Sequence, residues 1–214
     1  MRPLMRLIYT LGLATLLTGA LGWPLAGEAG PVLTLGEAEN RLVRGGYTET
    51  LLNAHWAVAQ GEAIVPLLGQ MLKKQKAYEK ELGGATGAFP FNALWALGHI
   101  PKASALKLLE KYSAASQDPS AALAIKGWKL RAEKGPGYGV LTNDARLREK
   151  PAAQARVVKE LKAGQPVKIK REMITNPGEE GPRGGPASYD QVETIPGGEK
   201  GYISRAGDDF SPFM

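Results

Sequence analysis

Two patterns of apolar and polar residues divide the chain. From Thr34 to Lys134 apolar residues recur every three or four positions, and alanine and leucine dominate. This is the period of an amphipathic α-helix. From Tyr138 onward apolar and polar residues alternate in short runs separated by glycine and proline, as in strands joined by tight turns. The sequence therefore predicts an α+β multidomain protein, with helices first and a small β-structure after them.

Local start and stop signals divide the first segment into six predicted helices. Thr34 followed by Glu37 is a capping box, in which a hydroxyl accepts from an orphan amide. Asp118 before Pro119 is an N-cap followed by a first-turn proline. We expect helices near residues 34–44, 48–60, 62–82, 90–98, 101–114 and 119–133.

The predicted helices contain an internal repeat. The sequence NAHWAV at residues 53–58 matches NALWAL at residues 92–97, an offset of 39, and a weaker copy covers residues 121–127. The second copy, with His99 and Pro101 after it, resembles the second helix of a HEAT-type repeat. The resemblance implies an array of stacked helix pairs over residues 31–134, because one pair cannot bury its apolar stripe alone. Trp56 and Trp95 occupy equivalent places in this pattern and are expected in the core.

The remaining residues predict strands and turns after a linker at 135–137. Leu147 should face the core and its neighbours Arg146 and Arg148 the solvent. The Gly/Pro-rich residues 174–188 predict a long exposed loop. Strands are expected at residues 138–142, 145–148, 159–163, 165–171, 189–195 and 201–204, with a hairpin at 196–200 and a tail that folds back or stays free.

The order of the pieces at residues 145–151, 156–170 and 201–204 resembles the bacterial SH3-like (SH3b) domain. The resemblance implies a small β-barrel over residues 138–214. It also implies a binding or adaptor role in an exported cell-envelope protein, with peptidoglycan or an envelope protein as the partner. The long Gly/Pro segment departs from the family pattern, so no ligand site carries over to it.

The first 29 residues have the pattern of a secretory signal peptide. Arg2 and Arg6 precede an uncharged, mostly apolar run at residues 7–21, and small residues occupy positions 27 and 29. The run is shorter than the roughly 20 apolar residues of a spanning helix, so membrane contact is expected only through an uncleaved signal. The sequence predicts export to the periplasm or exterior. Because cysteine is absent, disulfides, a lipidated cysteine and thiol catalysis are excluded.

The charge is basic. The formal net charge is +6, and +5 once Arg2, Arg6 and Glu28 leave with the predicted signal. Such an excess favours anionic surfaces. Nucleic acid is not an expected partner, because the exported segment has no concentrated basic helix and no base-stacking pattern. The lysines at the end of one predicted helix form a basic cluster: Lys73, Lys74, Lys76 and Lys80. This cluster is either a solvated face or a contact for an anionic polymer.

No catalytic or metal-binding pattern stands out. The two histidines, His55 and His99, lack the paired spacing of a zinc site. No phosphate-binding loop precedes a helix, and no serine lies in a nucleophile elbow. We therefore expect a non-enzymatic protein without metal or cofactor.

Binding residues are expected in the barrel at Arg146, Arg148, Tyr189 and Tyr202, because arginine and tyrosine are common binding anchors. Tyr202 is equally suited to a place in the core. The leading hypothesis is an exported adaptor that binds peptidoglycan or an envelope protein. Two alternatives stay open: a scaffold whose helices bind a protein while the barrel is only structural, and a cell-wall hydrolase with an unrecognised site.

Overall fold

The computed structural model describes residues 33–45, 50–83, 89–181, 185–205 and 213–214. Residues Leu33–Met214 form one compact unit. The predicted signal peptide, the start of the helix predicted near residues 48–60 and most of the tail lie outside the described residues. Of the helices described, none combines the length and apolar character needed to cross a membrane.

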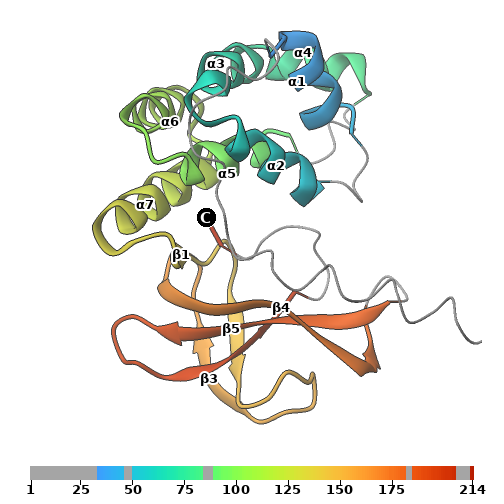
Figure 1. Ribbon diagram of the computed structural model, residues 1–214, viewed down its shortest axis with the longest axis vertical. Helices are drawn as coiled ribbons and strands as arrows, with labels where there is room; N and C mark the ends of the chain where they lie inside the picture. The colour runs from blue at the N-terminus through green and yellow to red at the C-terminus, as the bar shows by residue number, and fades with distance from the viewer. Residues whose placement is uncertain (1–32, 46–49, 84–88, 182–184, 206–212) are drawn as a thin grey trace, which may run out of the picture. The chain divides into compact units, whose positions relative to one another are not determined.

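Within the described residues, seven α-helices precede six β-strands (Figure 1). This confirms the coarse prediction of an α+β protein with its helices first. The helices are α1 (Leu35–Leu42), α2 (Thr50–Ala59), α3 (Val65–Lys73), α4 (Gln75–Glu81), α5 (Phe91–His99), α6 (Ala103–Ser116) and α7 (Pro119–Lys134), with a 3₁₀ turn, η2 (Gly61–Ile64), before α3.

Both predicted N-caps are present. Thr34 Oγ1 accepts a hydrogen bond from the Glu37 amide at 3.2 Å, at the start of α1. Asp118 Oδ1 accepts from the Ser120 amide at 2.8 Å, and Pro119 follows as the first residue of α7. These starts are set by local chemistry, since each cap satisfies an amide that the helix itself leaves without a partner.

The single helix predicted over residues 62–82 is wrong: the segment is divided into η2, α3 and α4. Lys74 has φ −91° and ψ 4°, outside the helical region, so α3 ends before it and α4 begins after it. The burial of the two helices differs accordingly. α3 buries four residues, whereas α4 buries only Tyr78. Few core contacts hold α4 in line with α3, so the chain can change direction at Lys74.

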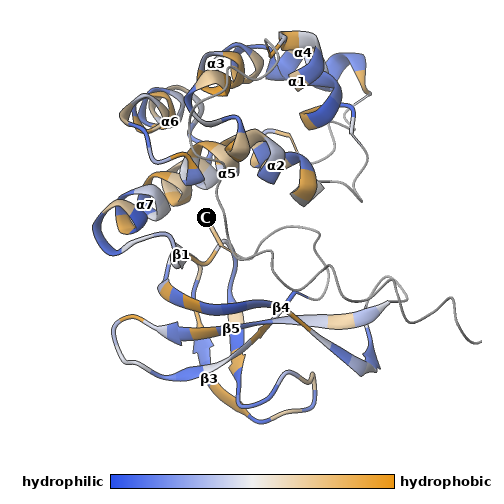
Figure 2. Ribbon diagram, in the orientation of Figure 1, coloured by the Kyte–Doolittle hydropathy of each residue, from blue (hydrophilic) through white to orange (hydrophobic). Residues whose placement is uncertain are grey.

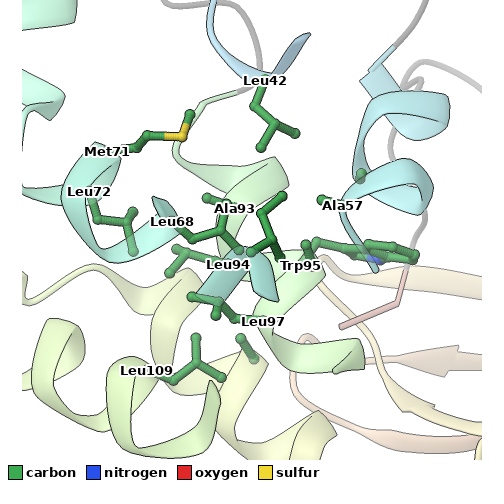
Figure 3. Packing of buried hydrophobic residues seen from close by; sticks show 14 of the residues in the cluster. Leu42, Ala57, Leu68, Met71, Leu72, Ala93, Leu94, Trp95, Leu97 and Leu109 are labelled. Atoms are coloured by element: carbon green, nitrogen blue, oxygen red, sulfur yellow. The ribbon is translucent and has the colours of Figure 1, made fainter. Parts of the chain in front are cut away.

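Helix α5 is the centre of the helical core. Every residue from Asn92 to Gly98 is buried, as expected for a helix with neighbours on all sides. α5 packs against both α2 and α7, and Figure 3 shows Leu94 and Leu97 of α5 in the same cluster as Leu68 of α3. Trp95 lies in this core at 4% exposure, as predicted. Trp56 is only partly buried, with the Arg41 guanidinium 4.7 Å from its ring centre.

The strands form one antiparallel sheet in the order β1-β4-β5-β6-β2-β3, and the sheet curls (Figure 1). Hydrophobic and hydrophilic residues alternate along the strands (Figure 2). Leu147 is fully buried, whereas Arg146 is exposed and Arg148 half-buried, so the predicted facing of this strand is confirmed. The strands are β1 (Tyr138–Val140), β2 (Ala145–Arg148), β3 (Val157–Leu161), β4 (Pro166–Glu180), β5 (Pro186–Thr194) and β6 (Lys200–Ser204).

The exposed loop predicted over residues 174–188 is wrong, because most of this segment extends the β4–β5 hairpin. The pairing continues to Glu180 opposite Pro186 and passes through three register shifts. Met173 has a positive φ of 52° at one of these irregular places. Bulges absorb residues such as Pro177 and Gly178 that interrupt a regular ladder, so a strand persists where the composition indicates a loop.

Hydrogen bonds join the helices to the sheet. The indole Nε1 of Trp95 in α5 donates to the Phe213 carbonyl at 2.8 Å. Val140 of β1 and Met214 exchange two backbone bonds of 2.9 Å, so the described end of the tail folds back on the sheet. Arg131 of α7 donates to the carbonyls of Gly98 at 2.6 Å and Tyr138 at 3.2 Å. Hydrogen bonds thus connect the helices before the predicted linker at 135–137 to the residues after it.

Candidate functional site

One row of side chains crosses four strands on the outer face of the sheet. Arg148 lies opposite Tyr202, Tyr202 opposite Gln191, and Gln191 opposite Arg171. Directly opposed residues of neighbouring strands project to the same face. Arg148, Tyr202, Gln191 and Arg171 therefore form what we call the sheet-face row, over β2, β6, β5 and β4. The sequence indicates Arg148 and Tyr202, but Gln191 and Arg171 join them only through the register.

The sheet-face row combines cations, a ring and an amide. Gln191 Nε2 donates to the Tyr202 hydroxyl at 3.4 Å, and Arg148 Nη1 donates to the Ala155 carbonyl at 2.7 Å. Tyr202 is half-buried on the face away from the core residue Ile203, so it is a surface residue rather than a core residue. The Arg171 side chain is exposed, with no ion pair to any residue that the structure describes. The row thus offers both hydrogen-bond donors and one flat ring.

Arg146 lies beside the row, at its β2 end. Its Nε is 3.2 Å from Glu160 Oε1, and both side chains are more than 60% exposed. Such surface pairs contribute little and exchange easily, so Arg146 remains available to a ligand. Together with Asp144, Arg148 and Ser204 it lines a shallow depression of about 420 Å³. The charges in this depression are mixed.

Tyr189, the fourth predicted barrel residue, is buried and has no exposed surface. Its hydroxyl donates to Glu179 Oε1 at 2.7 Å. Burial, and next the hydrogen bond to Glu179, raise the pKa of Tyr189 to about 12. Glu179 lies on the part of β4 that the sequence indicates as a loop, and it also accepts from the Ala153 amide at 3.0 Å. Tyr189 is therefore buried and bonded within the hairpin, and Glu179 joins the hairpin to the β2–β3 connection.

The four predicted lysines separate into two groups. Lys73 and Lys76, joined by Lys111 of α6, line a groove of about 620 Å³ between α3–α4 and α6. We call this the lysine groove. Lys74 is drawn away to Glu39 of α1 at 3.2 Å, and Lys80 is exposed outside the groove. The sequence does not indicate Lys111, because its place in the same groove as Lys73 depends on the packing of α6.

Glu39 of α1 is the centre of a polar cluster that includes Lys74. It accepts from the Tyr78 hydroxyl at 2.6 Å and from Lys74 Nζ at 3.2 Å, and Arg44 lies 3.9 Å away. The hydrogen bond from Tyr78, and then the contacts with the cations, lower the pKa of Glu39 despite its partial burial. Burial and the same bond raise the pKa of Tyr78. Lys74 thus belongs to a link between α1 and α4.

The two histidines contact the core tryptophan. The His99 ring stacks on Trp95 with centroids 3.8 Å apart, and the His55 ring meets it edge-on at 4.9 Å. His99 Nδ1 is 2.8 Å from the Trp95 carbonyl. Burial is the main cause that lowers the pKa of both histidines, so the neutral rings pack as aromatic groups. Among the described residues no three acids or histidines lie close enough to hold a metal ion.

Comparison with known proteins gives no match to a family model, a curated protein or a solved structure. The SH3b and HEAT-type resemblances therefore stay predictions. The sheet-face row and the lysine groove are the two arrangements from which a function can be argued.

Proposed function

We propose that the chain is an exported, non-enzymatic adaptor of the cell envelope that binds peptidoglycan through the sheet-face row. The observation that supports this is the register, which brings Arg148, Tyr202, Gln191 and Arg171 together on an accessible face. Guanidinium groups donate in fixed geometry to carboxylates, and a tyrosine ring gives a flat apolar surface beside a polar hydroxyl. Peptidoglycan presents carboxylates on its peptides and flat faces on its sugars.

The sequence supports the same proposal. The SH3b-like order of strand segments and the signal-peptide pattern are both typical of exported wall-binding proteins. The helices before the sheet, HEAT-like in their repeat, would give the adaptor its second surface.

Co-sedimentation with purified sacculi tests the proposal. The purified protein is expected to pellet with the sacculi, and the double variant Arg171→Ala/Tyr202→Ala to lose about tenfold or more in affinity, since anchors of this kind each contribute more than about 1 kcal/mol. Arg156→Ala is the control, because Arg156 is an exposed arginine directly before β3 and lies outside the row. Wild-type protein that stays in the supernatant, or a double variant that binds like the control, would refute wall binding through the row.

The lysine groove favours the alternative of a scaffold whose recognition lies on the helices. In that case the Arg171→Ala/Tyr202→Ala variant retains its protein partner, and substitutions in the groove release it. Pull-down from envelope extracts with both sets of variants separates the two functions.

A further inference from the structure

The lysine groove is a concave surface of the helices that wall binding through the sheet does not use. We propose that it docks an acidic peptide segment of a partner protein. Carboxylates of the segment bind Lys73, Lys76 and Lys111, and one apolar side chain rests on the floor of the groove. This site is independent of the sheet-face row.

The charge of the groove is incompletely balanced. The ammonium groups of Lys73, Lys76 and Lys111 form no ion pair with any residue that the structure describes, whereas Lys74 and Lys129 pair with Glu39 and Glu110. Lys73 and Lys76 are three positions apart, and Lys111 lies on the opposite wall of the groove. Like charges gathered in this way repel one another, and an anionic segment between them removes the repulsion.

Two carboxylates also line the groove, and both are engaged on their own elements. Glu79 accepts from Gln75 Nε2 at 2.8 Å, and Asp118 accepts from the Ser120 amide as the cap of α7. The wider surface is basic as well. Residues 33–134 contain 13 Lys and Arg against 9 Asp and Glu, but residues 135–214 contain 12 against 11. Most of the positive excess thus lies on the segment that holds the groove.

The floor of the groove selects a peptide over a purely anionic polymer. Gly69, Leu72 and Leu108 contribute apolar surface to it. The Tyr112 hydroxyl donates to Gln75 Oε1 at 2.8 Å, which ties α6 to α4 across the floor and fixes the width of the groove. A volume of about 620 Å³ is in the usual range for ligand sites. An acidic peptide supplies both an apolar side chain and carboxylates, whereas an anionic glycopolymer leaves the apolar floor uncovered.

Fluorescence anisotropy with synthetic peptides tests the proposal. The probe is a short labelled peptide of glutamates and leucines, and the comparison probes are oligoglutamate of equal length and heparin. We expect the glutamate–leucine peptide to bind most tightly and to weaken as the salt rises from about 0.05 to about 0.3 M, because the contacts are exposed charges.

Charge reversal in the groove gives the decisive comparison. Lys73→Glu/Lys111→Glu is expected to weaken binding of the glutamate–leucine peptide by about tenfold or more. Lys80→Glu/Lys107→Glu makes the same change of charge on exposed positions of α4 and α6 outside the groove and should bind nearly as wild type. Ala115→Trp, at an exposed position of the rim, should block the floor without a change of charge.

Four results overturn the docking of an acidic peptide. They are no binding by the wild type, equal losses in the groove and control variants, unchanged binding by Ala115→Trp, and heparin or oligoglutamate binding as tightly as the mixed peptide. The last of these would assign the groove to a polyanion. Sacculus binding by the groove variants should remain at the wild-type level, so failure of the groove leaves the proposal for the sheet-face row standing, and the reverse also holds.

Discussion

At the scale of single residues, Asp190 and Arg205 form a buried ion pair. Asp190 has no exposed surface, and Arg205 Nε lies 2.6 Å from its Oδ2. The Met173 amide donates to the other oxygen of Asp190 at 2.9 Å. Burial raises the pKa of Asp190, and the Arg205 guanidinium opposes that rise. The buried Asp190 carboxylate is therefore compensated by Arg205, which also pairs with the exposed Glu172 at 2.8 Å.

Removal of one partner should be worse than removal of both. Arg205→Met leaves the Asp190 carboxylate buried without its cation and should lower the free energy of unfolding by about 3–5 kcal/mol. Asp190→Leu/Arg205→Met leaves no uncompensated charge and should lose much less. Urea denaturation of the two variants measures the difference, and equal losses would show that the pair does not act as a unit.

The residues of the sheet-face row and the lysine groove show what a sequence can and cannot predict about a site. Arginine and tyrosine on a strand, or lysines at a helix end, are visible in the sequence. Which of them come together is not visible. Lys111 lines the same groove as Lys73 only through the packing of α6 on α3, and Arg171 aligns with Tyr202 only after a shifted register. Tyr189 has the chemistry of a ligand-binding residue, but it is buried in the β4–β5 hairpin. The Gly/Pro composition predicts a loop where part of this hairpin lies.

At the scale of elements, the sequence predicts a helix start correctly where the interactions that fix it lie within a few residues. The caps at Thr34 and Asp118 follow from hydrogen bonds within a few residues, and the sequence predicts both. The break at Lys74 and the long β4–β5 hairpin depend on tertiary packing and on bulges. Neither has a local signature, because a helical pattern continues across Lys74 and the Gly/Pro composition of residues 174–188 is typical of a loop.

The stability that Glu39 contributes by linking α1 to α4 should be lost at acid pH. The pKa of Glu39 is lowered in the folded protein, so its contribution to stability is present above the ordinary glutamate value and is lost as the pH falls through the lowered value. Glu39→Gln should therefore be less stable than wild type at pH 7, and the difference should vanish well below the ordinary pKa of about 4.3.

Thermal unfolding at several pH values measures this difference. Glu37→Gln is the matched control, because it removes the same charge from the exposed side of the same helix. A gap between wild type and Glu39→Gln that persists in acid would contradict the role assigned to the ionised carboxylate.

At the scale of the whole molecule, the contacts described between helices and sheet make Leu33–Met214 one compact unit. Trp95, in the middle of α5, donates across to Phe213, and Arg131 donates to carbonyls on both sides of residues 135–137. We therefore expect the helices and the sheet to lose their structure together, despite the contrast in their sequence patterns.

Trp95→Phe tests this coupling. The substitution removes the indole donor and part of a core ring, and should lower the free energy of unfolding by about 2–4 kcal/mol. The helical signal in far-UV circular dichroism and the hydrogen-exchange protection of the strand amides, both followed against denaturant, should shift by the same amount. A shift of the helical signal alone would show that the two segments unfold independently.

The hydrogen bond from Trp95 to Phe213 joins residues 118 positions apart in the chain, and this separation has a kinetic consequence. Helices form from neighbours in the sequence within microseconds, whereas distant pairings wait for a large loop to close. The indole of α5 lacks its carbonyl acceptor until that loop closes. The hydrogen bonding of the core around Trp95 is therefore complete only once the end of the chain has docked.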